Sequence, residues 1–228
     1  ATEQQWLREN AGFTEELVVI ESYLVKNADF FSSVSTKLVT CMEKTFGRTK
    51  KSFVLNNSTQ ATNSDAESDE LLPQQLVDVF NSSEKILLFH GVLSDLRGLS
   101  KFVKIFEDTP DSNWKLVLIG YNPGDEILKV MTKTKKTYLF SAVSGTKIKK
   151  IVGMSDLVLM PYPVSDINTK YGFANKLGDC IAEKVPFLYN KELEAIDDVA
   201  QKTSAGISFL WPELTFPGKL QSLLDEVE

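Results

Sequence analysis

The sequence predicts an α/β fold: a doubly wound parallel sheet, preceded by a smaller α/β unit. From residue 85 onward, six short apolar runs alternate with amphipathic segments of helical spacing. Several of the runs, such as residues 114–120, are apolar along nearly their whole length, which is typical of strands covered on both faces. Strands that alternate with helices in this way form a parallel sheet with helices on both sides.

The elements of this sheet follow one another in a regular order. The expected strands are residues 85–90, 114–120, 137–140, 157–160, 187–189 and 206–210. The expected helices are residues 99–107, 125–131, 146–152, 175–183, 193–202 and 220–227. In the first of these helices Phe102, Val103 and Phe106 recur at helical spacing, which predicts one buried face.

A smaller unit is expected before the sheet. Its elements are a helix at 14–26, a strand at 30–34, a helix at 36–46 and a strand at 52–56. Ser35 stands where an N-cap residue is favoured for the second helix. The apolar stripe of the first helix comprises Leu17, Ile20, Leu24 and Val25.

A polar stretch separates the two parts. From residue 57 to residue 70 the sequence holds no apolar residue larger than alanine, so this stretch has little surface to bury. It is expected to be a linker or an exposed loop. The predicted division is therefore a first part at 1–57, a linker at 58–70 and a main domain at 71–228.

Composition and charge exclude several classes of protein. The chain has 228 residues, of which 43% are hydrophobic and 25% charged, so it is not a disordered chain. Residues 1–80 carry 7 Lys and Arg against 12 Asp and Glu, and the remainder carries 18 against 19. This acidic to neutral balance argues against binding of nucleic acid. No apolar run is long enough to span a membrane.

The sequence offers few ligands for a metal ion. It contains two cysteines, Cys41 and Cys180, which lie far apart, and one histidine, His90. The usual zinc ligand set cannot be assembled from these, so no metal site is expected. Two distant cysteines are typical of a reducing, cytoplasmic setting. His90 ends a strand, and a structural role is favoured for it.

The carboxyl ends of the predicted strands are the place to look for a ligand site. The first strand is followed by Gly91, where the backbone can approach a ligand, and then by Arg97 and Gly98 at the start of the next helix. Helix N-termini and arginine side chains both bind phosphate oxygens. Alternatively, Gly91 is only a turn residue and Arg97 a solvated side chain.

A second pair of candidates lies further along. Lys176 and Asp179 are three residues apart near the start of a predicted helix and therefore share a face. A lysine at a helix N-terminus opposes the helix dipole, which an anion would offset, and a carboxylate suits a ribose diol. The alternative is a surface ion pair. Together, both pairs predict a site for a nucleoside diphosphate, although no dinucleotide fingerprint, P-loop or DxD motif is present.

These residues belong to a longer series of motifs. Gly91 and Arg97-Gly98 are followed by SDLVLMPYP at 155–163 and NKLGDCIAEKVPFL at 175–188. Upstream stand ESYLVKNADFFSSVSTKL at 21–38 and SFVLNN at 52–57. In order and spacing this series resembles GT-B fold glycosyltransferases of the GT4 type. Residues 85–228 resemble their C-terminal, Rossmann-like donor-binding half, and residues 1–57 resemble the end of their N-terminal, acceptor-binding domain.

The resemblance implies a function. The intact protein is expected to transfer a sugar from a nucleotide-diphosphate sugar, as substrate, to a glycan or lipid-linked acceptor. The resemblance implies retention of configuration without a metal or another cofactor. It implies catalytic roles for Arg97 and Lys176, and donor binding by Gly91, Val143, Ser165, Asp166 and Asp179.

The resemblance also implies partners. The chain is expected to be a fragment that works with a missing N-terminal domain or with a partner subunit. Cytoplasmic location is a further expectation. Lysines cluster at 133–136 and 147–150, which indicates either peripheral membrane contact or a solvated edge, and the solvated edge is favoured. Tyr171 and Val92 replace a glutamate and an arginine that are usual in the family. They favour the alternative, which is a degenerate nucleotide-binding or partner-interaction module without catalysis.

Overall fold

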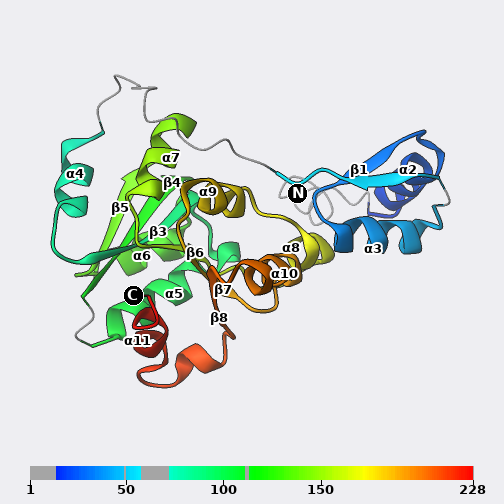
Figure 1. Cartoon of the computed structure of the whole chain (residues 1–228). Coiled ribbons are helices and arrows are strands. Elements are labelled where there is room, and N and C mark those ends of the chain that lie inside the picture. Colours follow the sequence, from blue (N-terminus) through cyan, green and yellow to red (C-terminus); the bar gives the residue numbers. More distant parts are fainter. Residues whose placement is uncertain (1–13, 49, 58–71, 111–112, 228) are drawn as a thin grey trace.

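A six-stranded parallel sheet forms the centre of the larger part of the molecule (Figure 1). The computed structural model describes residues 14–48, 50–57, 72–110 and 113–227. The strands are β3 (Lys85–Val92), β4 (Trp114–Tyr121), β5 (Thr137–Ser141), β6 (Leu157–Met160), β7 (Phe187–Asn190) and β8 (Gly206–Phe209). Their spatial order, β5-β4-β3-β6-β7-β8, is the order of a Rossmann fold. The doubly wound α/β class expected from the sequence is confirmed.

Helices cover both faces of this sheet. They are α4 (Gln74–Phe80), α5 (Leu99–Asp108), α6 (Asp125–Met131), α7 (Gly145–Gly153), α8 (Ile167–Tyr171), α9 (Asn175–Glu183), α10 (Glu194–Thr203) and α11 (Lys219–Leu224). The helices α7 and α9 pack together on one face, whereas α5 and α6 pack together on the other (Figure 1). The sequence analysis missed α4 and α8, because both are too short to show a clear helical repeat, and likewise the 3₁₀ turns Asp95–Arg97 and Glu213–Thr215.

The core lies between the sheet and these helices. The central residues of β3 and β4 are fully buried, among them Leu87, Leu88 and Leu116. The apolar face predicted for the helix after β3 is also buried, since Phe102 and Phe106 in α5 are inaccessible to solvent. The reason is the one seen in the sequence: a strand between two helical layers has no polar face.

Two glycines let β3 and β4 come close at their carboxyl ends. Gly91 and Gly120 are partners in the register of the two strands, and Gly91 adopts a φ of +115°, which favours glycine. A Cβ atom at Gly120 would lie 1.8 Å from the carbonyl oxygen of Gly91. Only a residue without a side chain fits at position 120.

The N-terminal unit has its own small sheet. It consists of α2 (Thr14–Asn27), β1 (Phe31–Ser33), α3 (Thr36–Phe46) and β2 (Ser52–Val54), with the two strands parallel. Ser35 caps α3 as expected, accepting a hydrogen bond from the backbone N–H of Leu38 at 3.0 Å. Arg48 is buried and donates to the carbonyl oxygens of Ala28 and Lys51 at 3.0 and 2.8 Å, which ties the unit together.

The apolar stripe expected on the first helix is only partly buried. Val25 lies in the core of the unit, but Ile20 and Leu24 are 54% and 58% exposed. Other large apolar side chains of the unit are exposed as well, namely Val18, Val19, Tyr23, Phe30, Phe53 and Leu55. The pattern predicted a helix correctly, but the described residues do not cover its apolar face.

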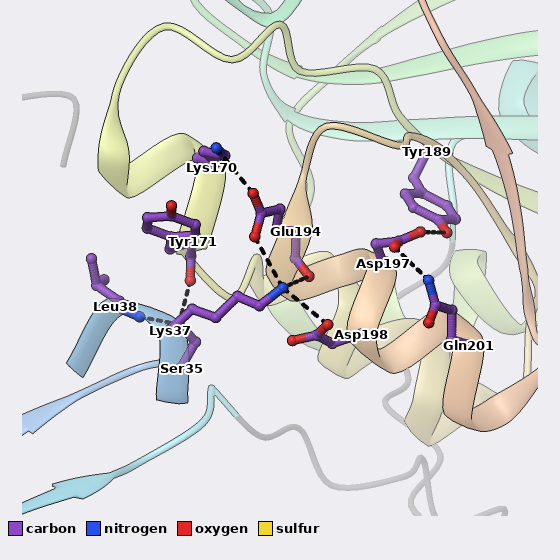
Figure 2. Close-up of polar contacts among 10 residues, drawn as sticks. All are labelled: Ser35, Lys37, Leu38, Lys170, Tyr171, Tyr189, Glu194, Asp197, Asp198 and Gln201. Carbon is purple, nitrogen blue, oxygen red and sulfur yellow. Dashed lines mark hydrogen bonds and ion pairs between the residues drawn. The ribbon is translucent and has the colours of Figure 1, made fainter. Parts of the chain in front are cut away.

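Charged groups join α3 of the N-terminal unit to the main domain (Figure 2). The Lys37 ammonium lies 3.1 Å from the Glu194 carboxylate and 3.0 Å from that of Asp198, both on α10. Lys170 on α8 binds the other carboxylate oxygen of Glu194 at 3.0 Å. Ser35 donates to the carbonyl oxygen of Tyr171. The N-terminal unit is therefore attached to α8 and α10.

The expected linker at 58–70 lies outside the described residues. The division into residues 1–57, 58–70 and 71–228 therefore stays a prediction.

The substitution Gly120→Ala tests the close approach of β3 and β4. We expect it to destabilise the fold by about 3 kcal/mol, because the new methyl group collides with backbone rather than with a side chain. Gly145→Ala is the matched control, since a Cβ at Gly145 meets nothing within 4 Å. Urea unfolding of both variants measures the difference, and equal stabilities would contradict the packing described here.

Candidate functional site

The candidate site lies at the switch point of the sheet. Here β3 has β4 on one side and β6 on the other, and the connections that leave β3 and β6 lead to opposite faces. In open α/β sheets ligands bind in the crevice outside the carboxyl ends of the strands at this point. Gly91 is the last residue but one of β3, and Tyr162 follows β6 after one intervening proline. These two residues mark the floor of the site.

Lys176 is a buried cation in the first turn of α9. It is only 8% exposed, and its Nζ donates a hydrogen bond to the Tyr162 hydroxyl at 2.6 Å. The same Nζ lies 3.8 Å from the centre of the Phe89 ring and 3.4 Å from the position of a Cβ at Gly91. Burial, together with the nearby Arg97 charge, lowers the pKa of Lys176 from 10.5 to about 7.

Arg97 contacts the same tyrosine. Its guanidinium carbon lies 4.8 Å from the centre of the Tyr162 ring, within range of a cation–π interaction. Gly98 follows with a φ of +74°, and a Cβ there would lie 2.6 Å from the Trp211 side chain. A turn with a positive φ thus places Arg97 against Tyr162; the side chain is half-buried, and its role in binding an anion stays a prediction.

Asp179 lies one turn after Lys176 on the same helix. It is 9% exposed, which excludes the alternative of a solvated surface ion pair between Asp179 and Lys176. One of its carboxylate oxygens lies 3.8 Å from Nε2 of His90. Burial and, next, the Lys176 charge lower the pKa of His90 from 6.5 to about 3. The imidazole is thus neutral at pH 7, and this contact is not an ion pair there.

The structure adds two residues that the sequence analysis did not single out. Tyr162 contacts both cations, and burial raises the pKa of its hydroxyl to about 12, so it stays neutral. Asn190, which ends β7, is fully buried and donates to the Tyr162 carbonyl oxygen at 2.9 Å. Both follow or end a strand at the predicted edge of the sheet, and that position was the only available signal.

The other predicted donor-site residues lie on neighbouring loops. Val143 follows β5, two strands away from β3, and packs against the core. Ser165 and Asp166 lie after β6, where the Asp166 carboxylate caps α8 by accepting from the N–H of Thr169 at 2.7 Å. The structure thus brings Gly91, Arg97, Lys176 and Asp179 together around Tyr162 and His90, and leaves these three residues beside that cluster.

The cluster combines two basic side chains, which suit an anion, with the Asp179 carboxylate, which suits hydroxyl groups. Arg97 and Lys176 both contact Tyr162, and Lys176 lies in the first turn of α9, an arrangement that favours a group with several negative charges. A carboxylate one turn away accepts hydrogen bonds from hydroxyl groups. Within the described residues, no group of three or more His, Cys, Asp or Glu side chains is placed to hold a metal ion. No helix in the same residues is long and apolar enough to cross a membrane.

The fold is shared with known sugar-transferring enzymes. The chain superimposes on a sucrose-phosphate synthase from Thermosynechococcus elongatus with a TM-score of 0.67 and 13% identity, covering 93% of this chain and 52% of that one. For an α,α-trehalose 6-phosphate synthase from Burkholderia multivorans the TM-score is 0.60 and the identity 11%, and the match covers 90% of this chain and 53% of that one. For the Anabaena protein HepE, solved with UDP-glucose, the TM-score is 0.60 and the identity 16%, and the match covers 92% of this chain and 56% of that one.

These likenesses establish the fold, which is the Rossmann-like fold of a GT-B C-terminal domain. The chain spans about half the length of these structures. No family profile and no curated protein sequence matches the chain.

The buried ammonium group predicts an unusual stability effect. We expect Lys176→Met to raise the free energy of unfolding at pH 7 by about 1 kcal/mol, or roughly 2–4 °C in Tm, because it removes a desolvated charge. In the wild type the folded pKa is lowered, so the unfolded chain binds more protons between pH 7 and 10.5 and stability rises with pH there. The variant should lose this contribution.

The control for this prediction is Lys104→Met, which replaces an exposed lysine on α5. It should change neither the stability at pH 7 nor its pH dependence. Thermal unfolding between pH 6 and pH 10 compares the three proteins. A Lys176→Met protein that is less stable than the wild type at every pH would contradict the assignment of a strained buried charge.

Proposed function

We propose that this chain carries the donor site of a glycosyltransferase and binds a nucleotide-diphosphate sugar as its substrate. The observation that carries the proposal is the pair of basic side chains, Arg97 and Lys176, which both contact Tyr162 at the switch point. A buried lysine with a lowered pKa is costly to the fold and is typical of a functional site. The fold of the structural neighbours supports the same function.

Each residue of the site has a proposed role. Arg97 and Lys176 stabilise the negative charge that develops on the leaving diphosphate, which is electrostatic catalysis by preorganised groups. Gly91 lets the phosphates approach the backbone, and Asp179 binds the ribose hydroxyls. The loop at Val143 holds the edge of the base. Ser165 and Asp166, at the N-terminus of α8, face the donor sugar.

The proposed reaction is transfer with retention of configuration to a glycan or lipid-linked acceptor. Because Arg97 and Lys176 supply positive charge at the leaving group, the proposed mechanism uses no metal ion. The acceptor would bind on the far side of the donor sugar. We place this activity in the cytoplasm, with peripheral membrane contact where the acceptor is lipid-linked.

A further domain or a partner subunit completes the proposed enzyme. The N-terminal unit exposes large apolar side chains on α2, and a two-stranded parallel sheet is too small to be stable alone. Parallel sheets are normally covered on both faces. The structural neighbours contain about as much chain again as the part that matches. These features support an acceptor-binding domain on the exposed side of α2.

The alternative function is a nucleotide-binding or partner-interaction module without catalysis. It is favoured by Tyr171, which stands where many GT4 enzymes carry a sugar-binding glutamate. The Tyr171 carbonyl oxygen accepts a hydrogen bond from Ser35 of the N-terminal unit, so this segment holds two parts of the chain together. Hydrolysis or transfer of a donor sugar by the chain with its partner would distinguish the enzyme from the module.

Nucleotide binding is the direct test of the proposed site. We expect at least one of UDP, GDP and ADP to raise the Tm of the protein, whereas the corresponding nucleoside should not. Arg97→Ala and Asp179→Ala should each weaken binding of that diphosphate about tenfold or more, because each removes a charged partner. Lys101→Ala and Asp78→Ala are matched controls on exposed side chains. No stabilisation by any diphosphate would overturn the proposal.

The affinity should also depend on pH. The Lys176 amine is protonated in the free protein only below its pKa of about 7, and the phosphates prefer the protonated form. Affinity for the diphosphate should therefore fall as pH rises from 7 to 9, by up to about tenfold per unit. Titration calorimetry measures this dependence. Lys176→Met should bind more weakly and show a flat profile over the same range, and an unchanged profile would remove Lys176 from the site.

A further inference from the structure

Among the described residues, the Nε2 atom of His90 is one of three buried side-chain polar atoms without a hydrogen-bond partner. His90 is the single histidine of the sequence and is 8% exposed. Its Nε2 is buried and makes no hydrogen bond within the described part of the chain. An unsatisfied buried nitrogen costs about 1–3 kcal/mol, so its presence calls for an explanation. A ligand that supplies the missing partner is one such explanation.

The geometry around Nε2 points to a hydroxyl group. Nε2 and the nearer Asp179 carboxylate oxygen are 3.8 Å apart, which is too long for a direct hydrogen bond. An oxygen atom that enters between them, with a shift of a neighbouring side chain because Nε2 is enclosed, would lie about 2.8 Å from both atoms. A hydroxyl is suited to this position because it can accept a hydrogen bond from Nε2–H and donate its own proton to the carboxylate.

The charges around His90 exclude an ion pair between His90 and Asp179 at pH 7. Lys176 and Asp179, both on α9, are the charged groups that face the imidazole. With the pKa near 3, the imidazole carries no charge to neutralise Asp179 at pH 7. The carboxylate thus faces a neutral nitrogen across a gap, and a neutral hydroxyl bridges the two groups without adding a charge.

We propose that His90 and Asp179 together bind one hydroxyl of the ribose of the nucleotide. His90 donates from Nε2–H to the hydroxyl oxygen, and the hydroxyl hydrogen is donated to Asp179. This inference rests on the proposed function and adds His90 to the site, in place of the structural role expected from the sequence. His90 then selects ribonucleotides against deoxyribonucleotides.

The test compares ribose with deoxyribose. Titration calorimetry is carried out with UDP and GDP and with their 2′-deoxy and 3′-deoxy forms. In the wild type, removing the bound hydroxyl should weaken binding about five- to tenfold, as expected for one buried hydrogen-bonded group. His90→Phe should bind the ribonucleotide as weakly as the wild type binds that deoxy form, and should no longer distinguish the two.

Two further variants separate recognition from folding. His90→Gln retains an N–H group at a similar reach and should retain part of the discrimination. Ser155→Ala changes a buried hydroxyl on the loop before β6, at the opposite end of the sheet, and should retain all of it. If His90→Phe weakens the ribo and deoxy forms equally, His90 is structural and the inference is wrong.

The single histidine allows an independent measurement on the wild type. Its imidazole gives one set of NMR signals, which should shift on addition of the ribonucleotide and much less with the deoxy form that lacks the bound hydroxyl. Nucleotide binding that leaves these signals unchanged would overturn the inference while leaving the proposed function intact. If none of the diphosphates binds, the inference on His90 and the proposed function are both wrong.

Discussion

The close approach of β3 and β4 at Gly91 and Gly120 is the constraint on which the site depends. Because neither residue carries a side chain, the carboxyl end of β3 stays open and the Lys176 ammonium can lie directly over it. A side chain at position 91 would adopt an unfavourable φ and would meet this ammonium. The absence of a side chain at Gly91 therefore leaves the space in which the Lys176 ammonium lies.

The buried charged and polar groups of the candidate site lower the stability of the fold. Lys176 and Asp179 are charged groups, and His90 is polar, yet all three are buried where an apolar core would be more stable. Phe89 and Tyr162 partly compensate, because aromatic rings and a hydroxyl replace some of the water around the ammonium. The helix α9 that carries two of these groups follows α8, to which the N-terminal unit is attached. Only residues 172–174 therefore separate α9 from the helix to which the N-terminal unit is attached.

Much of the main domain was predictable from the sequence. The strands at Leu116–Leu118 and Leu157–Met160 are buried runs, and their alternation with helices fixed the fold class. Gly91, Arg97, Lys176 and Asp179 were found because motif order placed them at strand ends and helix starts. Tyr162 and Asn190 were not, since their role depends on contacts between β6, β7 and α9, and no local pattern distinguishes them from ordinary core residues.

The sequence by itself determined the parallel α/β architecture and the loops that surround the site, because apolar periodicity and glycine positions are local properties. Only the tertiary structure decided which side chains are buried and what they face. It showed that Lys176 and Asp179 are buried, which excludes the alternative of a surface ion pair. It also left Ile20 and Leu24 exposed on α2 and placed His90 opposite a carboxylate. The physical reason is that desolvation and pairing depend on neighbours from distant parts of the chain.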